Sequence, residues 1–476
     1  MTNDFFILMK AELLVTAILF IILLMKVGGR ERPNTWLLPF INVLLLINLL
    51  IGFFGNREGR LFGELFRTNH LITLEKNMLS LATLIISLQA EPWLRRHKHV
   101  PEFYMLLLST LIGMFFMISS GNLLLFFIGL ELSTIPLAAL SNFDLEKRIS
   151  SEAAMKFIMS SAFSSGLLLF GISLIYGTTG TISFSGLAAQ LDGGPLQIFA
   201  FILLLAGFAF KISVVPFHLW TADVYEGSPV AVTAYLSVVS KGAVLFVFVS
   251  VLYTVFKVLD RTWYDMIVLL SVLSMVIGNL FALRQQNMKR FLAFSSIAQM
   301  GFILIGLSGQ SDTGSTSVIY FILVYIFSNL GAFGVVSLIS AATGKENMDD
   351  YKGMYKTNPL LCWVLTISLF SLAGIPPTAG FFGKFFLLLA GAGKGNYVLI
   401  TIAALNMVIS LYYYLRVVKA MFMDEHAEPV ARIETGMSSR MALAICVGGI
   451  LITGLASGAY QYIYALSVSL NLSHGH

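Results

Sequence analysis

The sequence predicts an all-α polytopic membrane protein with about fourteen transmembrane helices. Three observations support this fold class: 57% of the 476 residues are hydrophobic, only 12% are charged, and the mean hydropathy is +0.84. Soluble domains carry about twice that charged fraction. A spanning helix needs about 20 apolar residues, and together with its loop it takes roughly 30 to 35 residues. The length of the chain therefore accommodates about fourteen helices and leaves little for a soluble domain.

The predicted helices follow apolar runs that short polar breaks separate. The first run contains Lys10 and Glu12, but it is too long for the apolar core of a signal peptide, so it is assigned as a spanning helix. In chain order the runs cover residues 4–27, 36–54, 72–90, 103–120, 122–141, 150–177, 196–220, 228–256, 263–283, 291–308, 316–342, 357–391, 396–418 and 440–467. An even number of helices places both termini on the same side of the membrane.

Basic residues orient these helices. Seventeen lysines and arginines lie in the odd-numbered loops and six in the even-numbered loops. Loops rich in lysine and arginine stay on the cytoplasmic side, or the matrix side in an organelle. Both termini are therefore expected to face outward, which is the periplasmic side in a bacterium.

Missing motifs exclude several function classes. Cys362 and Cys446 lie inside apolar runs without a C-x-x-C spacing, and an iron–sulfur cluster needs about four ligands. No glycine-rich nucleotide motif occurs, since the fragment Gly391 to Lys394 lacks both the first glycine and the following Ser or Thr. The net charge of +5 and the pI near 9.0 come mostly from short loops, so nucleic acid is not an expected partner. No metal or cofactor is expected in this chain.

Five charged residues lie deep inside the apolar runs: Glu131, Lys156, Lys211, Lys241 and Lys384. Glu131 is some ten residues from the end of the fifth helix, which places it roughly 15 Å deep. Lys156 follows the same turn on the sixth helix. If that helix begins within the segment from Asp144 to Arg148, Lys156 reaches about the same depth as Glu131, and an antiparallel hairpin would bring the two together. Facing lipid, the five charges would cost on the order of 12–18 kcal/mol, so they are expected to face protein or internal water.

Two interpretations of these charges stay open. Static ion pairs explain Glu131 with Lys156 but leave the other three lysines without an intramembrane carboxylate. Burial disfavours the charged form of a lysine and a nearby carboxylate favours it, so a lysine whose partner comes and goes can take up and release a proton. A proton relay is the favoured interpretation, and static packing is the alternative.

Three further basic residues inside the runs need no special role. Lys10 and Arg416 lie near helix ends, where long side chains reach the interface. Lys76 stands beside Glu75, at a point where the third helix has not yet entered the hydrocarbon.

Two of the predicted helices contain breaks near their buried lysines. Pro216 follows Lys211 in the seventh helix, and Pro376 and Pro377 precede Lys384 in the twelfth. Each proline removes an intrahelical hydrogen bond, and the freed carbonyls need other partners. His218 either extends a relay or caps such carbonyls.

Five helices separate the two breaks, which suggests two five-helix repeats, helices 4–8 and 9–13. An odd repeat length inverts the second copy, an architecture that places ion sites at broken helices near the midplane. The expected division is 1–100 for helices 1–3, 101–257 for the first repeat, 258–420 for the second, and 421–476 for the C-terminal loop and helix 14.

The chain resembles the antiporter-like membrane subunits of respiratory complex I (NADH:quinone oxidoreductase). The segments that carry the resemblance are Glu102 to Tyr104, Phe126 to Pro136, Ser151 to Lys156, Lys211 to Tyr225, Ser240 with Lys241, Asn287 to Ala298, and Gly374 to Phe385. They span roughly residues 100 to 390. Lysine rather than glutamate at position 384 argues against an M-type subunit, and the absence of a long lateral helix argues against an L-type. The N-type subunits are the most similar.

The resemblance implies a proton channel unit of a translocase in a bacterial inner membrane, without redox chemistry in this chain. Glu131 with Lys156 would form the coupling pair, Lys211 the central site, Lys241 the axial connection, and Lys384 the site of the second half. Relatives often carry a histidine where Gln299 stands, so the link from Lys241 to Lys384 would rely on water and on Gln299 as a hydrogen-bond bridge.

The resemblance also implies partners. Flavin (FMN), iron–sulfur clusters and quinone would be bound by other subunits, and K-type and M-type membrane subunits would be the neighbours in the bilayer. The alternative is a subunit of an Mrp-type cation/proton antiporter or of a membrane-bound hydrogenase. A passive scaffold, whose buried charges only lock subunits together, is a third reading.

Overall fold

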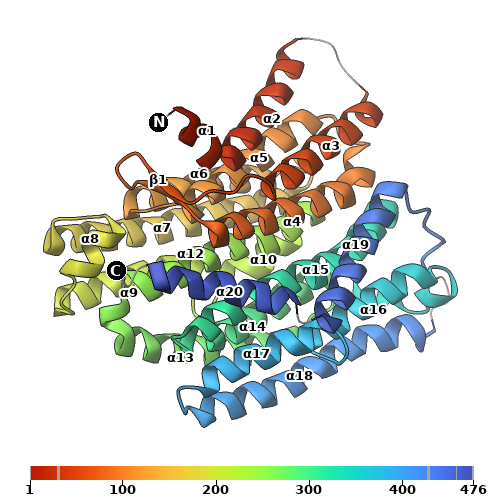
Figure 1. Ribbon diagram of the computed structural model, residues 1–476. Coiled ribbons are helices and arrows are strands. Elements are labelled where there is room, and N and C mark those ends of the chain that lie inside the picture. Colours follow the sequence, from red (N-terminus) through yellow and green to blue (C-terminus); the bar gives the residue numbers. More distant parts are fainter. Residues whose placement is uncertain (1, 29–32, 426–428, 457, 474–476) are drawn as a thin grey trace.

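The protein is a bundle of long apolar helices with one short β-hairpin. The computed structural model describes residues 2–28, 33–425, 429–456 and 458–473 (Figure 1). Within those ranges, eleven helices are long and apolar enough to cross a membrane, and three shorter apolar helices accompany them. The chain is therefore a mostly helical, multi-pass membrane protein, as the composition predicts.

A helix lies over every predicted apolar run. The first half contains α1 (Thr2–Leu8), α2 (Lys10–Val27), α3 (Asn34–Gly52), α4 (His70–Leu94), α5 (Val100–Ile118), α6 (Leu123–Ser141), α7 (Arg148–Thr179), α8 (Phe184–Gln190), α9 (Pro195–Lys211), α10 (Leu219–Gly227), α11 (Val230–Tyr235) and α12 (Lys241–Thr254). The second half contains α13 (Asp260–Ala282), α14 (Met288–Ser308), α15 (Asp312–Thr343), α16 (Pro359–Ala373), α17 (Ala379–Ala392), α18 (Tyr397–Phe422), α19 (Met437–Leu455) and α20 (Gly458–Ser473).

Short elements complete the chain. A π-helical turn (Leu236–Ser240) joins α11 to α12, and 3₁₀ turns cover Lys257–Leu259, Met348–Tyr351 and Met354–Lys356. The strands β1 (Gly59–Leu61) and β2 (Phe66–Thr68) pair antiparallel between α3 and α4, with Arg60 opposite Arg67. We call the side of the bundle that carries this hairpin the hairpin face.

The sequence prediction differs from the structure in three places. The hairpin makes the fold not strictly all-α; β2 is held by the loop between α5 and α6, where the Arg67 amide donates to the Ser119 carbonyl. The first run divides into α1 and α2 at Met9, and the last run divides into α19 and α20 after Leu455. An apolar run predicts a membrane-spanning segment, but the point where its helix is interrupted depends on contacts with distant parts of the chain.

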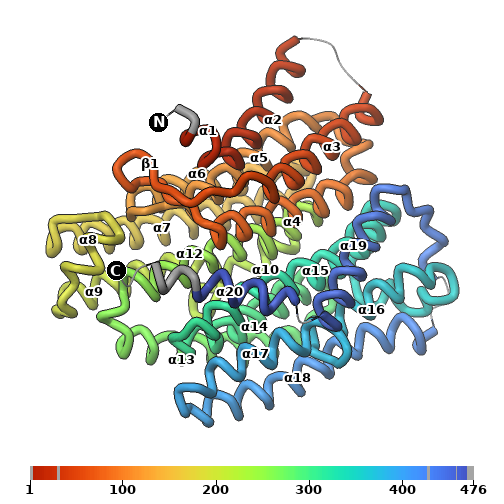
Figure 2. Tube along the Cα trace, in the orientation of Figure 1, coloured from red at the N-terminus to blue at the C-terminus, as the bar shows by residue number. Residues whose placement is uncertain are grey.

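The most deeply buried helices are α14 and α15 at the centre of the bundle (Figures 1 and 2). By contrast, α7 and α18 expose about two thirds of their apolar windows. Helices α2 to α5 lie together on one side of this centre, and α16 to α18 lie on the other. A polar residue on α14 therefore faces protein on all sides and needs an internal partner.

Candidate functional site

Lys211 is the last residue of α9, immediately before the break in the seventh predicted span. Its buried ammonium donates to Thr134 Oγ1 on α6 at 2.5 Å and to Ser161 Oγ on α7 at 2.9 Å. Glu131, one turn before Thr134, interacts with Lys211 electrostatically. Hydroxyl groups hold the lysine without neutralising it, and Glu131 is the carboxylate within electrostatic range.

Glu131 and Lys156 do not form the expected pair. The Lys156 ammonium contacts Asp223 Oδ2 on α10 at 2.6 Å and Glu152 at 2.8 Å, and its side chain is 43% exposed. Glu131 is half-buried, and its Oε1 has no hydrogen-bond partner among the described residues. Equal depth in the membrane was the basis for pairing them, but depth does not fix the direction in which each helix turns its side chain.

A close approach of α10 to α7 explains the contact between Lys156 and Asp223. Gly227 ends α10, and a Cβ there would lie 2.5 Å from the Ile149 carbonyl oxygen and 2.6 Å from Ala153 Cβ. A larger residue would push α10 away from α7. The glycine therefore brings Asp223 within reach of the lysine one turn along α7.

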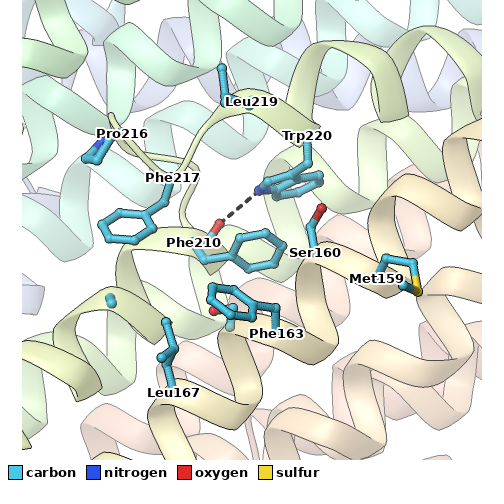
Figure 3. Close-up of a pocket in the computed structure, with 11 residues that line it drawn as sticks. Met159, Ser160, Phe163, Leu167, Phe210, Pro216, Phe217, Leu219 and Trp220 are labelled. Carbon is cyan, nitrogen blue, oxygen red and sulfur yellow. Dashed lines mark hydrogen bonds between the residues drawn. The ribbon is translucent and has the colours of Figure 1, made fainter.

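Residues 212–218 break the helix as predicted. Ser213 takes a positive φ of 62°, the Val215–Pro216 peptide is cis, and the Val215 amide donates to Ser274 Oγ at 2.9 Å. Trp220 Nε1 donates to the Phe210 carbonyl at 3.2 Å and so spans the break. Figure 3 shows that bond beside an open pocket of about 430 Å³, lined mainly by apolar side chains of α7, α9 and α10.

His218 lies at the start of α10 and is buried. It hydrogen-bonds to the Pro216 backbone, and its Nδ1 has no partner among the described residues. This is the local capping arrangement that the sequence left open. A bridging role for His218 stays a prediction.

Lys241 begins α12, directly after the π-helical turn. Its ammonium donates to Ser296 Oγ on α14 at 2.7 Å and lies 5.4 Å from the centre of the Tyr225 ring, with 1% of the residue exposed. Single π-helical turns inside α-helices often occur at functional sites. The sequence did not reveal this turn, because its residues are as apolar as the rest of the helix.

Lys384 lies on α17, after the second break. Its ammonium donates to the carbonyls of Leu372 at 2.7 Å and Ala373 at 3.2 Å, and it is 4.6 Å from the centre of the Phe302 ring. These carbonyls end α16, so the break frees them as predicted, and the lysine is their partner. A cation at a helix C-terminus is favourable because the aligned peptide dipoles point their negative end there.

Gln299 on α14 shares one of these carbonyls with Lys384. Its Nε2 donates to the Leu372 oxygen at 2.9 Å and to Tyr414 Oη at 3.2 Å, and Tyr414 also hydrogen-bonds to Ser295. Ser295 is adjacent to Ser296, the partner of Lys241. Polar contacts thus follow α14 from Lys241 to Lys384. They are continuous except between Ser296 and Ser295, which are adjacent in the chain.

A group of ionic residues at the face opposite the hairpin is not among the predicted site residues. Arg290 Nη1 contacts Asp223 Oδ1 and Glu226 Oε2, each at 2.7 Å, and the Lys289 ammonium lies 3.0 Å from Glu346. Asp223 therefore lies between Lys156 and Arg290. The signal was present: two acids sit three residues apart on α10, and adjacent basic residues begin α14.

A second correction concerns Lys76, which was expected near the interface without a special role. It is buried, and its ammonium contacts Glu12 Oε1 on α2 at 2.5 Å. The third helix begins two residues earlier than the apolar run suggested, and the first helix supplies the carboxylate. Lys10 and Arg416 do reach the backbone carbonyls of loops and helix ends.

The described residues contain no group of three or more His, Cys, Asp or Glu side chains able to hold a metal ion. The two cysteines are buried and unpaired. The groups of this site that can take up or release a proton are the lysine amines and the Glu131 carboxyl, and the hydroxyls and carbonyls hold the amines by hydrogen bonds.

Comparisons with known proteins agree with this arrangement. Residues 120–410 match the family described as NADH:quinone oxidoreductase/Mrp antiporter, TM. A Phocaeicola vulgatus protein named NADH-quinone oxidoreductase subunit N is 46% identical over 460 residues, covering 96% of this chain and 97% of the relative. A Paramagnetospirillum magneticum protein of the same name is 36% identical over 427 residues, covering 87% of each chain.

Solved structures show the same fold. A chain of respiratory complex I from Thermus thermophilus superposes with a TM-score of 0.81 at 27% identity, covering 94% of this chain and 97% of that one. A chain of the Mrp complex from Dietzia sp. reaches a TM-score of 0.86 at 22% identity, covering 96% of each, and shows the likeness of the fold alone. The chain therefore belongs to the family of transmembrane subunits of NADH:quinone oxidoreductase and Mrp antiporters, and within it to the group of NADH-quinone oxidoreductase subunit N.

Proposed function

We propose that this chain is a proton-translocating membrane-arm subunit of an NADH:quinone oxidoreductase. The observation that carries the proposal is the set of three buried lysines, Lys211, Lys241 and Lys384. Each is held by hydroxyl or carbonyl oxygens, and none has a carboxylate in direct contact among the described residues. An ion pair meant only for packing would contain its counter-ion.

The path runs parallel to the membrane. Glu131 provides the negative charge near Lys211. Protons pass from Lys211 to Lys241, which follows the π-helical turn. From Lys241 the polar contacts along α14 lead through Gln299 to Lys384. Internal water would complete the steps between lysines, since a bridging water is nearly as favourable as a direct hydrogen bond. Lys156 acts through Asp223 in this proposal, and His218 and Gln299 are bridging groups. Glutamine cannot change charge, so Gln299 bridges through hydrogen bonds alone.

The architecture supports the same proposal. Fourteen spans with inverted repeats at helices 4–8 and 9–13 would place the breaks at 212–218 and 374–378 in equivalent positions of the two halves. The divisions 1–100, 101–257, 258–420 and 421–476 follow from that scheme. Both termini would then lie on the hairpin face, the periplasmic side of a bacterial inner membrane.

The chain carries out no redox step of its own in this proposal. FMN, iron–sulfur clusters and quinone belong to partner subunits, and K-type and M-type subunits flank the chain in the membrane. The relatives named NADH-quinone oxidoreductase subunit N, at 46% and 36% identity, favour this assignment over an Mrp-type antiporter or a membrane-bound hydrogenase, because the likeness to the solved Mrp complex rests on fold alone.

The test replaces Lys211 by alanine in the assembled complex. We expect Lys211→Ala to lower NADH-driven proton translocation by at least about tenfold, because a relay loses its titratable group beside the break. Gln299→Ala should have a smaller effect, since an added water can replace an amide. Proton uptake is measured in inverted vesicles with a pH-sensitive dye, with complex content checked on native gels. Equal and small losses for both variants, with normal assembly, would contradict the relay.

A further inference from the structure

Helix α4 carries a polar stripe along its whole length, outside the relay described above. The stripe consists of Thr73, Lys76, Ser80, Thr83, Ser87 and Glu91, and all six residues are buried. At about 100° per residue these positions fall within about 80° of one another on the helix surface. From Thr73 to Glu91 the rise is about 27 Å, close to the thickness of a bilayer's hydrocarbon core.

Polar residues of the neighbouring helices face this stripe. Glu12 on α2 contacts Lys76, Asn48 on α3 donates to Ser80 Oγ at 3.3 Å, and Asn42 on α3 accepts from Ser87 at 2.5 Å. On α5, Tyr104 hydrogen-bonds to Ser87 at 2.7 Å. Together with the stripe these residues form a polar seam among α2, α3, α4 and α5, which lie side by side in Figure 1.

The seam meets the central helices at Tyr235. This buried tyrosine hydrogen-bonds to Thr83 of the seam and accepts from Thr110 Oγ1 on α5 at 2.9 Å. Tyr235 is the last residue of α11, immediately before the π-helical turn that leads to Lys241. The seam therefore leads from the hairpin face toward the relay lysine at the centre of the bundle.

The end of the seam at the hairpin face is open. A small cavity of about 20 Å³ lies there, lined by apolar residues of α1 and α2 and by polar residues that include Lys10, Asn56, Arg57, Thr73 and Lys76. That volume is sufficient for about one water molecule. Glu12 is 1% exposed, and its Oε2 has no hydrogen-bond partner among the described residues. A buried carboxylate oxygen without a donor is costly unless water reaches it.

Other charged groups surround the pair of Glu12 and Lys76. Lys10 and Glu75 both interact electrostatically with Lys76, and Glu75 also interacts with Arg67 on β2. Three cations and two carboxylates thus occupy the ends of α2 and α4 and the hairpin. Residues 12 to 91 precede the segment 120–410 that the family comparison matches.

We propose that this seam takes up water from the hairpin face and that the Glu12 and Lys76 pair exchanges protons with it. Lys76 lines the cavity and Glu12 lies behind it, so a hydronium ion in the cavity gives its proton through one further bridging water to Glu12 Oε2. An O–H bond forms at Oε2 as one O–H bond of the bridging water breaks, that water takes a proton from the hydronium, and water remains. The pair then holds one additional positive charge until the proton leaves along the seam or back to the cavity. The proton step rests on the function proposed above, whereas the uptake of water does not.

The uptake of water is tested with single cysteines in the assembled complex. Ser80→Cys places a thiol in the seam, and Ala82→Cys places one on the opposite side of the same helix, at a position that is equally buried. Both native cysteines are buried, so they give a low background. We expect a small cationic methanethiosulfonate added at the hairpin face to label Ser80→Cys about tenfold faster than Ala82→Cys, because thiols react as hydrated thiolates.

Thr83→Cys provides a second position in the seam, so that a failure of Ser80→Cys to assemble does not decide the result. Equal and slow labelling at the seam and control positions would overturn the proposal. Labelling that is fast only from the face opposite the hairpin would also overturn it, because the cavity lies at the hairpin end.

The proton step is tested with the uncharged double variant Glu12→Gln with Lys76→Met. A pair needed only for packing tolerates the loss of both charges together. We expect normal assembly and NADH oxidation, with fewer protons translocated for each NADH. Ser109→Ala is the matched control, because that hydroxyl bonds only within α5. Full translocation in the double variant would overturn the proton step. Failure of the proposed function is a separate result, visible as normal pumping in Lys211→Ala.

Discussion

Asp223 joins the two halves of the chain through ion pairs. It accepts from Lys156 on α7 and from Arg290 on α14, so one carboxylate holds a cation from each half. Glu226, one turn away on α10, contacts Arg290 as well. Any movement of α10 relative to α14 would therefore change the environment of Lys156.

A double-mutant cycle distinguishes the partner that the structure shows from the one that the sequence suggested. We expect Lys156→Met and Asp223→Asn to be coupled by about 0.5–3 kcal/mol in the free energy derived from translocation rates, the range for residues in contact. Lys156→Met with Glu131→Gln should be additive within about 0.3–0.5 kcal/mol. The rates are measured in vesicles that contain equal amounts of complex. Strong coupling to Glu131 and none to Asp223 would show that the working complex pairs Lys156 differently.

Glu226→Gln tests which of the two acidic residues of α10, Asp223 or Glu226, contributes more to translocation. Arg290 keeps Asp223 in that variant, and Lys156 keeps both of its partners, so translocation should fall less than in Asp223→Asn. The comparison uses the same vesicles. A larger loss in Glu226→Gln would assign the central position to Glu226.

Burial of the relay lysines was predictable from the sequence, but their partners were not. Lys211, Lys241 and Lys384 lie far from the ends of apolar runs, and all three are buried. Position along a helix gives depth, whereas contact also needs the direction of the side chain and the neighbouring helix. For this reason the sequence suggests a pair of Lys156 with Glu131 and does not indicate the contact of Lys76 with Glu12.

At the level of elements, the two breaks are stabilised in different ways. The first is spanned by the bond from Trp220 to the Phe210 carbonyl. The second begins at Gly374, whose φ of 87° ends α16, and the freed carbonyls of Leu372 and Ala373 accept from Lys384. Prolines in the sequence located both breaks, but only the structure shows that a relay lysine is a structural partner of the second.

Substitution of Gly374 should separate backbone strain from the position of Lys384. An alanine in the left-handed region costs about 1–2 kcal/mol, and at position 374 its Cβ would also lie 3.2 Å from Lys384 Cδ. Gly344→Ala is the control: Gly344 has a φ of 70° at the end of α15, with no neighbouring atom within 4 Å of an added Cβ. We expect similar losses of thermal stability in both variants and reduced translocation only in Gly374→Ala.

Thermal stability is measured on the purified complex, and translocation in vesicles. Equal translocation in the two variants would show that Lys384 tolerates displacement by its neighbour. Reduced translocation in Gly344→Ala would instead assign the effect to general strain.

On the surface of the whole molecule, α7 exposes two charged side chains next to apolar ones such as Met155 and Met159. Lys156 and Glu152 are 43% and 61% exposed on α7. The helix has 32 residues and is therefore about 48 Å long, so centring it on about 30 Å of hydrocarbon leaves about 9 Å outside at each end. Lys156 begins about 12 Å from the first residue and thus lies just inside the hydrocarbon.

That surface leads to the prediction that the chain requires lateral partners. A charged side chain that faces lipid at the centre of a membrane helix costs about 2.5–3.5 kcal/mol, and one just inside the hydrocarbon costs less. Either cost falls when a neighbouring subunit covers the charged group. Expression of this gene alone should yield a product that is degraded or aggregated, whereas co-expression with the other membrane subunits should yield a complex that survives mild detergent and migrates as one species on a native gel. Lys156→Met, which removes the exposed cation, should raise the amount recovered alone while lowering translocation in the complex. A stable, monomeric chain that conducts protons by itself would show that the relay needs no continuation into neighbours.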